Sequence, residues 1–209
     1  MDSKEKFKLN SKKEFSISYI MFLITLILMG IGMKVYQFEK QTLIEFVFMA
    51  FYLVFAFLVA EKDKRNRNID KYVLYYGIVI SCIYIVFLCI LKESFLSTGM
   101  AYILALIATL IIDSSIQLKK AKNSYLMSVI ILIIIQSIFT GIVITAISLA
   151  IALVSIGIVG LYYYTKNKMN KYIKTNENFF KEVKVGHIIC FSNIFIYIGF
   201  LLVNYLFFN

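Results

Sequence analysis

Three polar residues interrupt long apolar stretches of this chain: Glu45, Gln136 and Asn204 each lie about one helical turn from an end of such a stretch. In membrane hydrocarbon an ionisable or strongly polar side chain is costly, and such residues often line a path for ions or substrates. Their matching depth predicts an outward-facing polar vestibule or ion path. Asn193, about two turns from the opposite end of the last stretch, is a further candidate. In the alternative interpretation, each polar group only hydrogen-bonds a neighbouring helix.

His187 and Cys190 are three residues apart and therefore share one face of a helix. A cysteine nucleophile needs a histidine within hydrogen-bond reach, so this pair raises the hypothesis of a membrane peptidase. Two side chains of one helix seldom reach the required geometry, and no Asp or Asn is evident to orient the imidazole. The catalytic and phosphate-binding motifs of the common enzyme classes are also absent from the sequence. We therefore expect no catalytic residues, and nothing in the sequence argues for an enzyme.

Metal and cofactor sites are not expected either. The chain has one histidine and three cysteines, without the spacing of zinc ligands. Cys82 and Cys89 are seven residues apart and are interpreted as small apolar residues.

The apolar stretches that carry these polar residues are long enough to cross a bilayer. Hydrophobic residues make up 61% of the 209 residues, and the mean hydropathy is +0.82. A bilayer core of about 30 Å requires roughly 17–25 apolar residues per helix. The sequence predicts an all-α, polytopic membrane protein, a single transmembrane domain over 17–208 with seven helices. The predicted spans are 17–36, 42–60, 72–91, 97–113, 123–140, 142–164 and 186–208.

The basic residues predict the orientation of the seven spans. Of the 22 Lys and Arg residues, 19 lie in the N-terminal arm (1–16) and in every second connection after it, and three lie in the remaining connections. Loops rich in Lys and Arg stay in the cytosol. The N-terminus is therefore predicted inside and the C-terminus outside. The net charge of +10 is explained by contact with anionic lipid headgroups, so nucleic acid is not an expected partner.

The connection 165–185 has a pattern of its own. Apolar residues recur at helical spacing on one face, and lysines occupy much of the other. This pattern predicts a cytosolic amphipathic helix that lies in the headgroup region; a flexible basic linker is the alternative. The residues expected to contact lipid headgroups are Lys168, Lys171, Lys174, Lys181, Lys184, Phe179 and Phe180.

Small residues four apart predict which helices pack closely. They occur in the fourth span (Ala101, Ala105, Thr109) and in the sixth (Ala146, Ala150, and separately Ser148, Ala152), and small side chains let two helix backbones approach. We therefore expect the fourth and sixth spans to be central and the Phe-rich second span to face lipid on much of its circumference. The absence of proline favours unbroken helices.

Two classes of function agree with these features. The first is a small carrier, channel or permease subunit with an outward-facing polar vestibule. The second is a non-transporting accessory protein, for example an immunity, defence or signalling partner, that acts through protein contacts in the membrane or as a homo-oligomer. A composition rich in Ile, Lys, Asn, Phe and Tyr favours a bacterial plasma membrane as the location.

Overall fold

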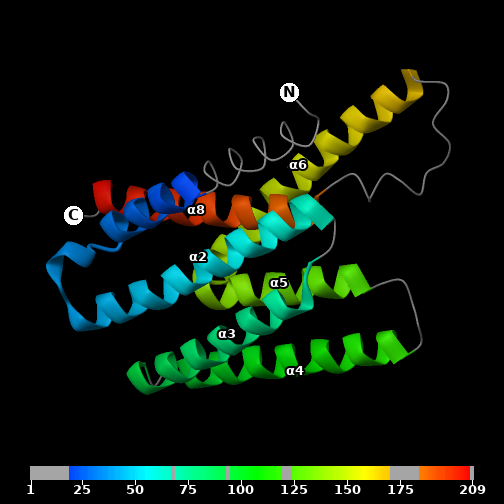
Figure 1. Ribbon diagram of the computed structural model, residues 1–209. Helices are drawn as coiled ribbons and strands as arrows, with labels where there is room; N and C mark the ends of the chain where they lie inside the picture. The colour runs from blue at the N-terminus through cyan, green and yellow to red at the C-terminus, as the bar shows by residue number, and fades with distance from the viewer. Residues whose placement is uncertain (1–18, 67–68, 93–94, 119–123, 170–183, 208–209) are drawn as a thin grey trace, which may run out of the picture. The chain divides into compact units, whose positions relative to one another are not determined.

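The computed structural model describes residues 19–66, 69–92, 95–118, 124–169 and 184–207, and these residues are helical throughout apart from short turns (Figure 1). A first helix covers Tyr19–Gly32 and is followed by a short 3-10 helix, η1 (Val35–Gln37). The remaining helices are α2 (Lys40–Asn66), α3 (Lys71–Leu91), α4 (Leu96–Leu118), α5 (Ser124–Thr140), α6 (Ile142–Met169) and α8 (Val185–Phe207). The prediction of an all-α protein is confirmed for this part of the chain.

Five of these helices are long and apolar enough to cross a membrane: α2, α3, α4, α6 and α8. Two shorter apolar helices, Tyr19–Gly32 and Tyr125–Thr140, coincide with the other two predicted spans. A helix therefore lies at each of the seven expected places. The number of crossings and their orientation stay predictions.

The residues group into two compact units. Unit 1 contains Met1–Val54 and Ile198–Asn209, and unit 2 contains Phe55–Tyr197. In unit 1 the phenol of Tyr36 in η1 is hydrogen-bonded to the phenol of Tyr205 near the end of α8.

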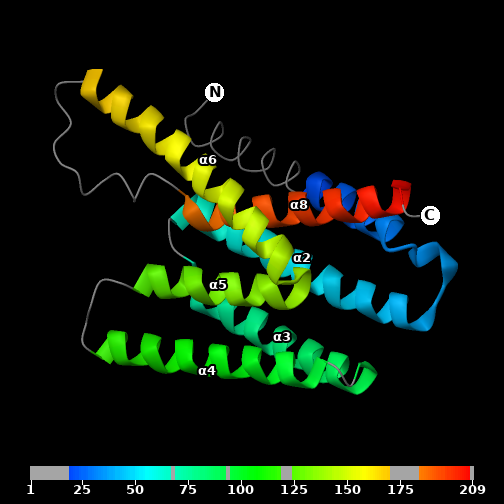
Figure 2. The same cartoon turned by 180° about the vertical axis from the view of Figure 1, so that it is seen from behind.

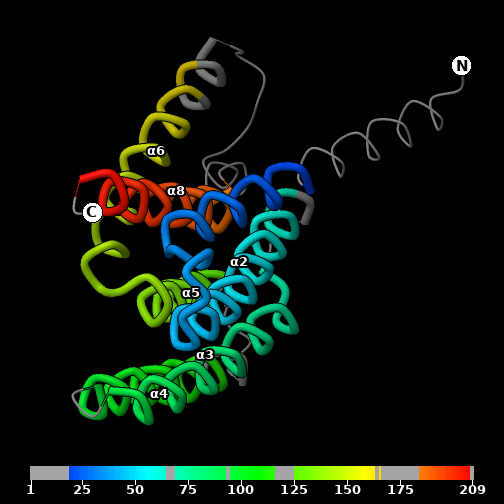
Figure 3. Tube along the Cα trace, turned by 90° about the vertical axis from the view of Figure 1, so that its left-hand side faces the viewer, coloured from blue at the N-terminus to red at the C-terminus, as the bar shows by residue number. Residues whose placement is uncertain are grey.

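In unit 2, α5 is the helix around which the others pack. It contacts α3, α4 and α6 and lies between α4 and α6 (Figure 1, Figure 2). The α3 and α4 helices run side by side (Figure 3). Leu132 and Ile135 of α5 are completely buried, and Phe139 stacks on Tyr84 of α3 with 5.0 Å between the ring centroids.

The prediction that the fourth and sixth spans are central is wrong. Only 11% of the apolar window of α4 and 17% of that of α6 is buried, against 39% for α2. The small residues Ala101, Ala146 and Ala150 are exposed, whereas Ser148 and Ala152 on the other predicted face of α6 are buried. The α2 helix, expected to face lipid on much of its circumference, has one side that buries several aromatic side chains, including Tyr52 and Phe55. Large apolar side chains fill the interior, because they supply more dispersion contacts than alanine.

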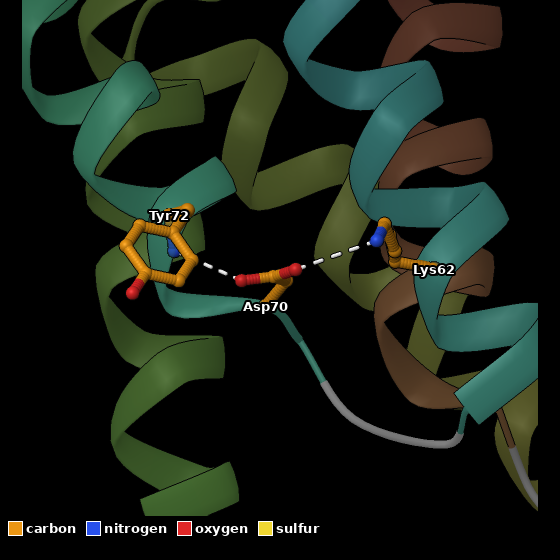
Figure 4. A network of polar contacts seen from close by, with 3 residues as sticks. All are labelled: Lys62, Asp70 and Tyr72. Atoms are coloured by element: carbon orange, nitrogen blue, oxygen red, sulfur yellow. Dashed lines mark hydrogen bonds and ion pairs between the residues drawn. The ribbon is translucent and has the colours of Figure 1, made fainter.

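Charged residues beside the apolar stretch of α3 cap its start and connect it to α2. Asp70 precedes α3, and its Oδ1 accepts a hydrogen bond from the backbone N–H of Tyr72 at 3.0 Å (Figure 4). Its Oδ2 lies 3.4 Å from Nζ of Lys62 in α2. Asp70 is thus an N-cap that satisfies one of the unbonded N–H groups at the helix start.

The connection between α5 and α6 is a single residue, Gly141, whose φ of +84° is in the left-handed region. L-residues with a Cβ disfavour this conformation, whereas glycine adopts it freely. Figure 2 shows the sharp corner that results. The corner brings the last residues of α5 against the first turns of α6, and this contact positions the polar residues described next.

Candidate functional site

A buried carboxylate lies at the end of unit 2 where α2, α5 and α8 meet. Asp63 belongs to the charged continuation of α2 beyond its apolar stretch, yet it is completely buried. Its Oδ1 accepts a hydrogen bond from Tyr125 Oη of α5 at 3.0 Å, and its Oδ2 accepts one from the backbone N–H of His187 at 3.0 Å. We name Asp63, Tyr125, Gly186 and His187 the Asp63 junction.

The junction satisfies N–H groups at the start of α8. The first N–H groups of any helix have no partner within the helix, and here His187 donates to Asp63 while Gly186 donates to Tyr125 Oη at 3.3 Å. A Cβ at position 186 would lie 3.2 Å from Asp63 Oδ2, so glycine lets the carboxylate approach. A negative charge at this end of a helix also interacts favourably with the helix dipole.

The imidazole of His187 is held by α2 and by its own helix. Its Nδ1 lies 3.3 Å from the carbonyl oxygen of Ala60, which can only accept a hydrogen bond, so Nδ1 carries the proton. The ring packs against Phe191, with 4.7 Å between centroids. These contacts orient the ring toward α2.

A second group of polar residues lies deeper in unit 2, between α5, α6 and α8. Its members are completely or almost completely buried: Gln136, Thr140, Thr145, Ser148, Cys190 and Asn193. We name this group the core polar cluster. Asn193 Nδ2 donates hydrogen bonds to Thr140 Oγ1 and to Ser148 Oγ, both at 3.2 Å. Across the corner, Thr140 Oγ1 lies 3.1 Å from Thr145 Oγ1.

The hydroxyl groups of the cluster also bond to the backbone of their own helices. Thr140 Oγ1 lies 3.0 Å from the carbonyl oxygen of Gln136, and Thr145 Oγ1 lies 2.9 Å from that of Gly141. Because each hydroxyl has one hydrogen, one of the two threonines donates to its carbonyl and the other donates to the first one's hydroxyl. Ser148 donates to the carbonyl of Thr145 at 2.8 Å. Bonds of this kind let hydroxyl side chains exist inside apolar helices. The cluster therefore joins three helices through short, mutually bonded side chains.

Gln136 is the least satisfied member of the core polar cluster. Its Nε2 lies 3.8 Å from Cys190 Sγ, a weak hydrogen bond, and its buried Oε1 has no hydrogen-bond partner among the described residues. If the amide is turned over, Cys190 S–H donates to Oε1 and Nε2 loses its partner. One polar end of this amide is therefore open in either orientation.

A groove of about 310 Å³ adjoins the cluster between α4, α5 and α6. Its walls include Tyr102 and Ala105 of α4, Ser137 of α5, and Thr145 and Ala146 of α6. Tyr102 Oη donates to the carbonyl of Ser137 at 3.1 Å. Thr145 belongs both to the groove and to the core polar cluster, so the two share a wall.

The candidate residues predicted from the sequence are divided between the two units. Gln136 and Asn193 both belong to the core polar cluster, where the hydroxyl of Thr140 contacts the backbone carbonyl of Gln136 and accepts a hydrogen bond from the side-chain amide of Asn193. Glu45 lies in unit 1, half-buried on α2, and accepts a hydrogen bond from Gln41 Nε2 at 3.3 Å. Asn204 is half-buried in the part of α8 that belongs to unit 1. A polar vestibule lined by all four of these candidate residues stays a prediction.

The predicted lipid-contacting segment falls mostly outside the described residues. Lys168 lies in the last turn of α6, and Lys184 directly precedes α8. The other members of the set, Lys171, Lys174, Lys181, Phe179 and Phe180, lie in 170–183, outside the described part of the chain.

The hypothesis of a His187–Cys190 nucleophile has no support in the geometry. The imidazole faces Ala60, and the thiol lies beside the amide of Gln136. Within the described ranges, no three His, Cys, Asp or Glu side chains are gathered where they could hold a metal ion.

Sequence reasoning missed Asp63 and Tyr125 as site residues, and of the hydroxyl residues of the cluster it singled out only Ser148, as a small residue of the sixth span. Asp63 stands in a run of charged residues and resembles an ordinary solvated side chain in the sequence. Thr140 and Thr145 carried one usable signal. They flank Gly141, and a glycine between two apolar stretches without any charge indicates a tight corner.

Five helices apolar enough to cross a membrane, with buried polar residues joining α5, α6 and α8, indicate a membrane protein of the α-helical class. Comparisons with protein-family models, with curated proteins and with solved structures gave no match.

Proposed function

We propose that this protein is a small multi-pass carrier, channel or permease subunit, and that a polar solute crosses unit 2 through the core polar cluster. The buried amide of Gln136, with one end open, carries this proposal. A buried polar group without a partner costs about 1–3 kcal/mol. A solute that bonds to the amide while passing would offset this cost.

The arrangement of the polar residues supports a path rather than a single contact. Cys190 contacts the side-chain amide of Gln136, and Thr140 contacts the backbone carbonyl of Gln136 and the side chains of Thr145 and Asn193. Each step joins side-chain or backbone polar atoms within helices that are otherwise apolar. Buried polar groups of this kind often line substrate and ion paths in membrane proteins.

The proposal extends to the orientation and the surroundings. The basic connections would lie in the cytosol against anionic headgroups, and the composition suggests a bacterial plasma membrane. The Asp63 junction, which follows an apolar stretch on the basic side, would then mark the cytosolic end of unit 2. Glu45 and Asn204 would line the predicted outer vestibule.

The proposal is tested by reconstituting the purified protein in liposomes and measuring the passage of water, glycerol, urea, protons and potassium. We expect at least one of these probes to cross faster than in protein-free liposomes, and the variant Gln136→Leu to lose that passage. Ser114→Ala is the matched control, because Ser114 is exposed and bonds to the carbonyl of Leu110 in its own helix. Equal passage with and without the protein contradicts the proposal.

A non-transporting accessory protein is the second candidate. The exposed Ala146, Ala150 and Gly157 of α6 favour it, because small residues let a helix of another protein approach closely. In this case the core polar cluster only joins helices. Gln136→Leu would then leave every probe unaffected and would raise thermal stability, since it removes an unsatisfied amide.

A further inference from the structure

We infer that the solute taken by the core polar cluster is a small uncharged molecule that forms hydrogen bonds, of the size of water, urea or glycerol, and not an ion. This inference rests on the proposed function and names the substrate class of the same site. Three features of unit 2 support it: the charge of the cluster, the bonding of Asp63, and the groove beside Thr145.

The core polar cluster contains no carboxylate, amine, guanidinium or imidazole group. Its six members are two amides, three hydroxyl groups and one thiol. An ion that leaves water for a buried site loses several kcal/mol of hydration unless a counter-charge or a ring of oxygen ligands replaces it. A neutral solute needs only donors and acceptors, and the open end of the Gln136 amide can provide either, depending on its orientation.

Asp63 does not supply the missing counter-charge. Both of its oxygens are already bonded, Oδ1 to Tyr125 Oη and Oδ2 to the backbone N–H of His187. Its charge is directed at the start of α8, where the helix dipole stabilises it. A cation recruited by Asp63 would have to compete with these donors.

The groove beside the cluster also favours an uncharged solute. It is bounded by side chains such as Ala105, Ala146 and Leu149, and its volume of about 310 Å³ is at the lower end for small-molecule sites. The hydroxyl of Tyr102 is already bonded to the carbonyl of Ser137. A solute entering here would reach Thr145, which is bonded to Thr140 in the cluster. An apolar entrance of this kind rejects ions far more strongly than neutral molecules.

The experiment separates the two kinds of probe in liposomes containing the full chain. Stopped-flow light scattering measures the entry of water, urea and glycerol, and an internal pH dye or a potassium indicator measures ion entry. We expect a several-fold increase for at least one neutral probe over protein-free liposomes and no increase for protons or potassium. Gln136→Leu should abolish the increase, and Ala146→Phe, which narrows the groove, should reduce it.

Ser148→Ala removes one hydroxyl from the cluster with little change in volume, and it replaces Gln136→Leu if that variant does not fold. Ser114→Ala should keep the full neutral passage. Entry of ions without entry of any neutral probe overturns this inference and leaves the proposed function standing. Passage of neither kind overturns both. Neutral passage that survives in Gln136→Leu and in Ser148→Ala shows that the solute does not use the cluster, and it overturns the inference as well.

Discussion

Asp63 Oδ2 accepts a hydrogen bond from the backbone N–H of His187 at 3.0 Å, so a carboxylate of α2 caps the first turn of α8. The two residues are 124 positions apart in the sequence. Tyr125 of α5 contributes to the same contact. Three helices of unit 2 therefore meet at one buried charge. We expect its removal to weaken the contacts among all three helices and to lower the stability of the protein.

The first prediction concerns this charge. Asp63→Asn keeps the shape but replaces one acceptor oxygen with a donor, so either Tyr125 or the N–H of His187 loses its acceptor. We expect a loss of about 1–3 kcal/mol in the free energy of unfolding, measured as a lower midpoint of thermal unfolding in detergent.

Asp70→Asn is the matched control for this prediction. Asn caps a helix as well as Asp does, and the exposed pair with Lys62 contributes less than about 1 kcal/mol. The control should therefore remain close to the unmodified protein. Equal effects of the two variants would contradict the special role of Asp63.

The second prediction concerns the corner between α5 and α6. Gly141→Ala places a Cβ on a residue with φ of +84°, which costs about 1–2 kcal/mol. Gly157 of α6 offers the opposite case, because it is helical and a Cβ there would meet no atom within 4 Å. Gly157→Ala should stabilise the protein by about 0.5–1 kcal/mol. Thermal unfolding of both variants, side by side, tests the sign of each effect.

The third prediction concerns orientation. Reporter fusions after Asn66 and after Lys174 should report the cytosol, and a fusion after Asn209 should report the exterior. The reason is that 19 of the 22 basic residues lie in the N-terminal arm and in every second connection after it, and loops rich in Lys and Arg stay in the cytosol. A cytosolic C-terminus would be incompatible with seven crossings.

The fourth prediction concerns the outer part of the proposed path. Glu45→Gln keeps the shape and the hydrogen-bonding capacity of the side chain but removes its charge. An uncharged solute needs hydrogen-bonding groups and not a charge, so we expect solute passage to be kept in this variant. Expression and thermal stability should also remain nearly unchanged, because Gln41 can still donate to position 45. Loss of passage in this variant, measured in the same liposome assay, would show that the charge of Glu45 is required and would contradict an uncharged solute.

The positions of the helices could be predicted from the sequence because bilayer thickness limits the length of an apolar stretch. The ends of the helices could not. The α2 helix continues through Glu61–Asn66 and α4 as far as Leu118, since helix formation does not stop where apolarity stops. The packing arrangement of the helices could not be predicted either. Alanines that are exposed on α6 and alanines that are buried on α2 both lie in apolar stretches, and the sequence does not distinguish them.

Part of the candidate site was visible in the sequence and part was not. Gln136 and Asn193 stand out because amides are rare in apolar stretches, and the structure brings them into one cluster. Asp63 has charged neighbours on both sides, Lys62 and Lys64, and only the fold reveals that it is buried. Its role depends on contacts with α5 and α8, which no local pattern encodes.

The most direct test of the account uses Cys190, whose thiol lies 3.8 Å from the amide of Gln136. Cys82 and Cys89 are first replaced by alanine, so that Cys190 is the remaining thiol. The folded protein in liposomes is then treated with a small neutral methanethiosulfonate, and the rate of modification is compared with that of the heat-unfolded protein. If polar solutes pass through the core polar cluster, Cys190 reacts in the folded protein at a measurable rate, and Gln136→Leu slows the reaction. If Cys190 reacts only after unfolding, the cluster is closed packing between helices and the proposed path is wrong.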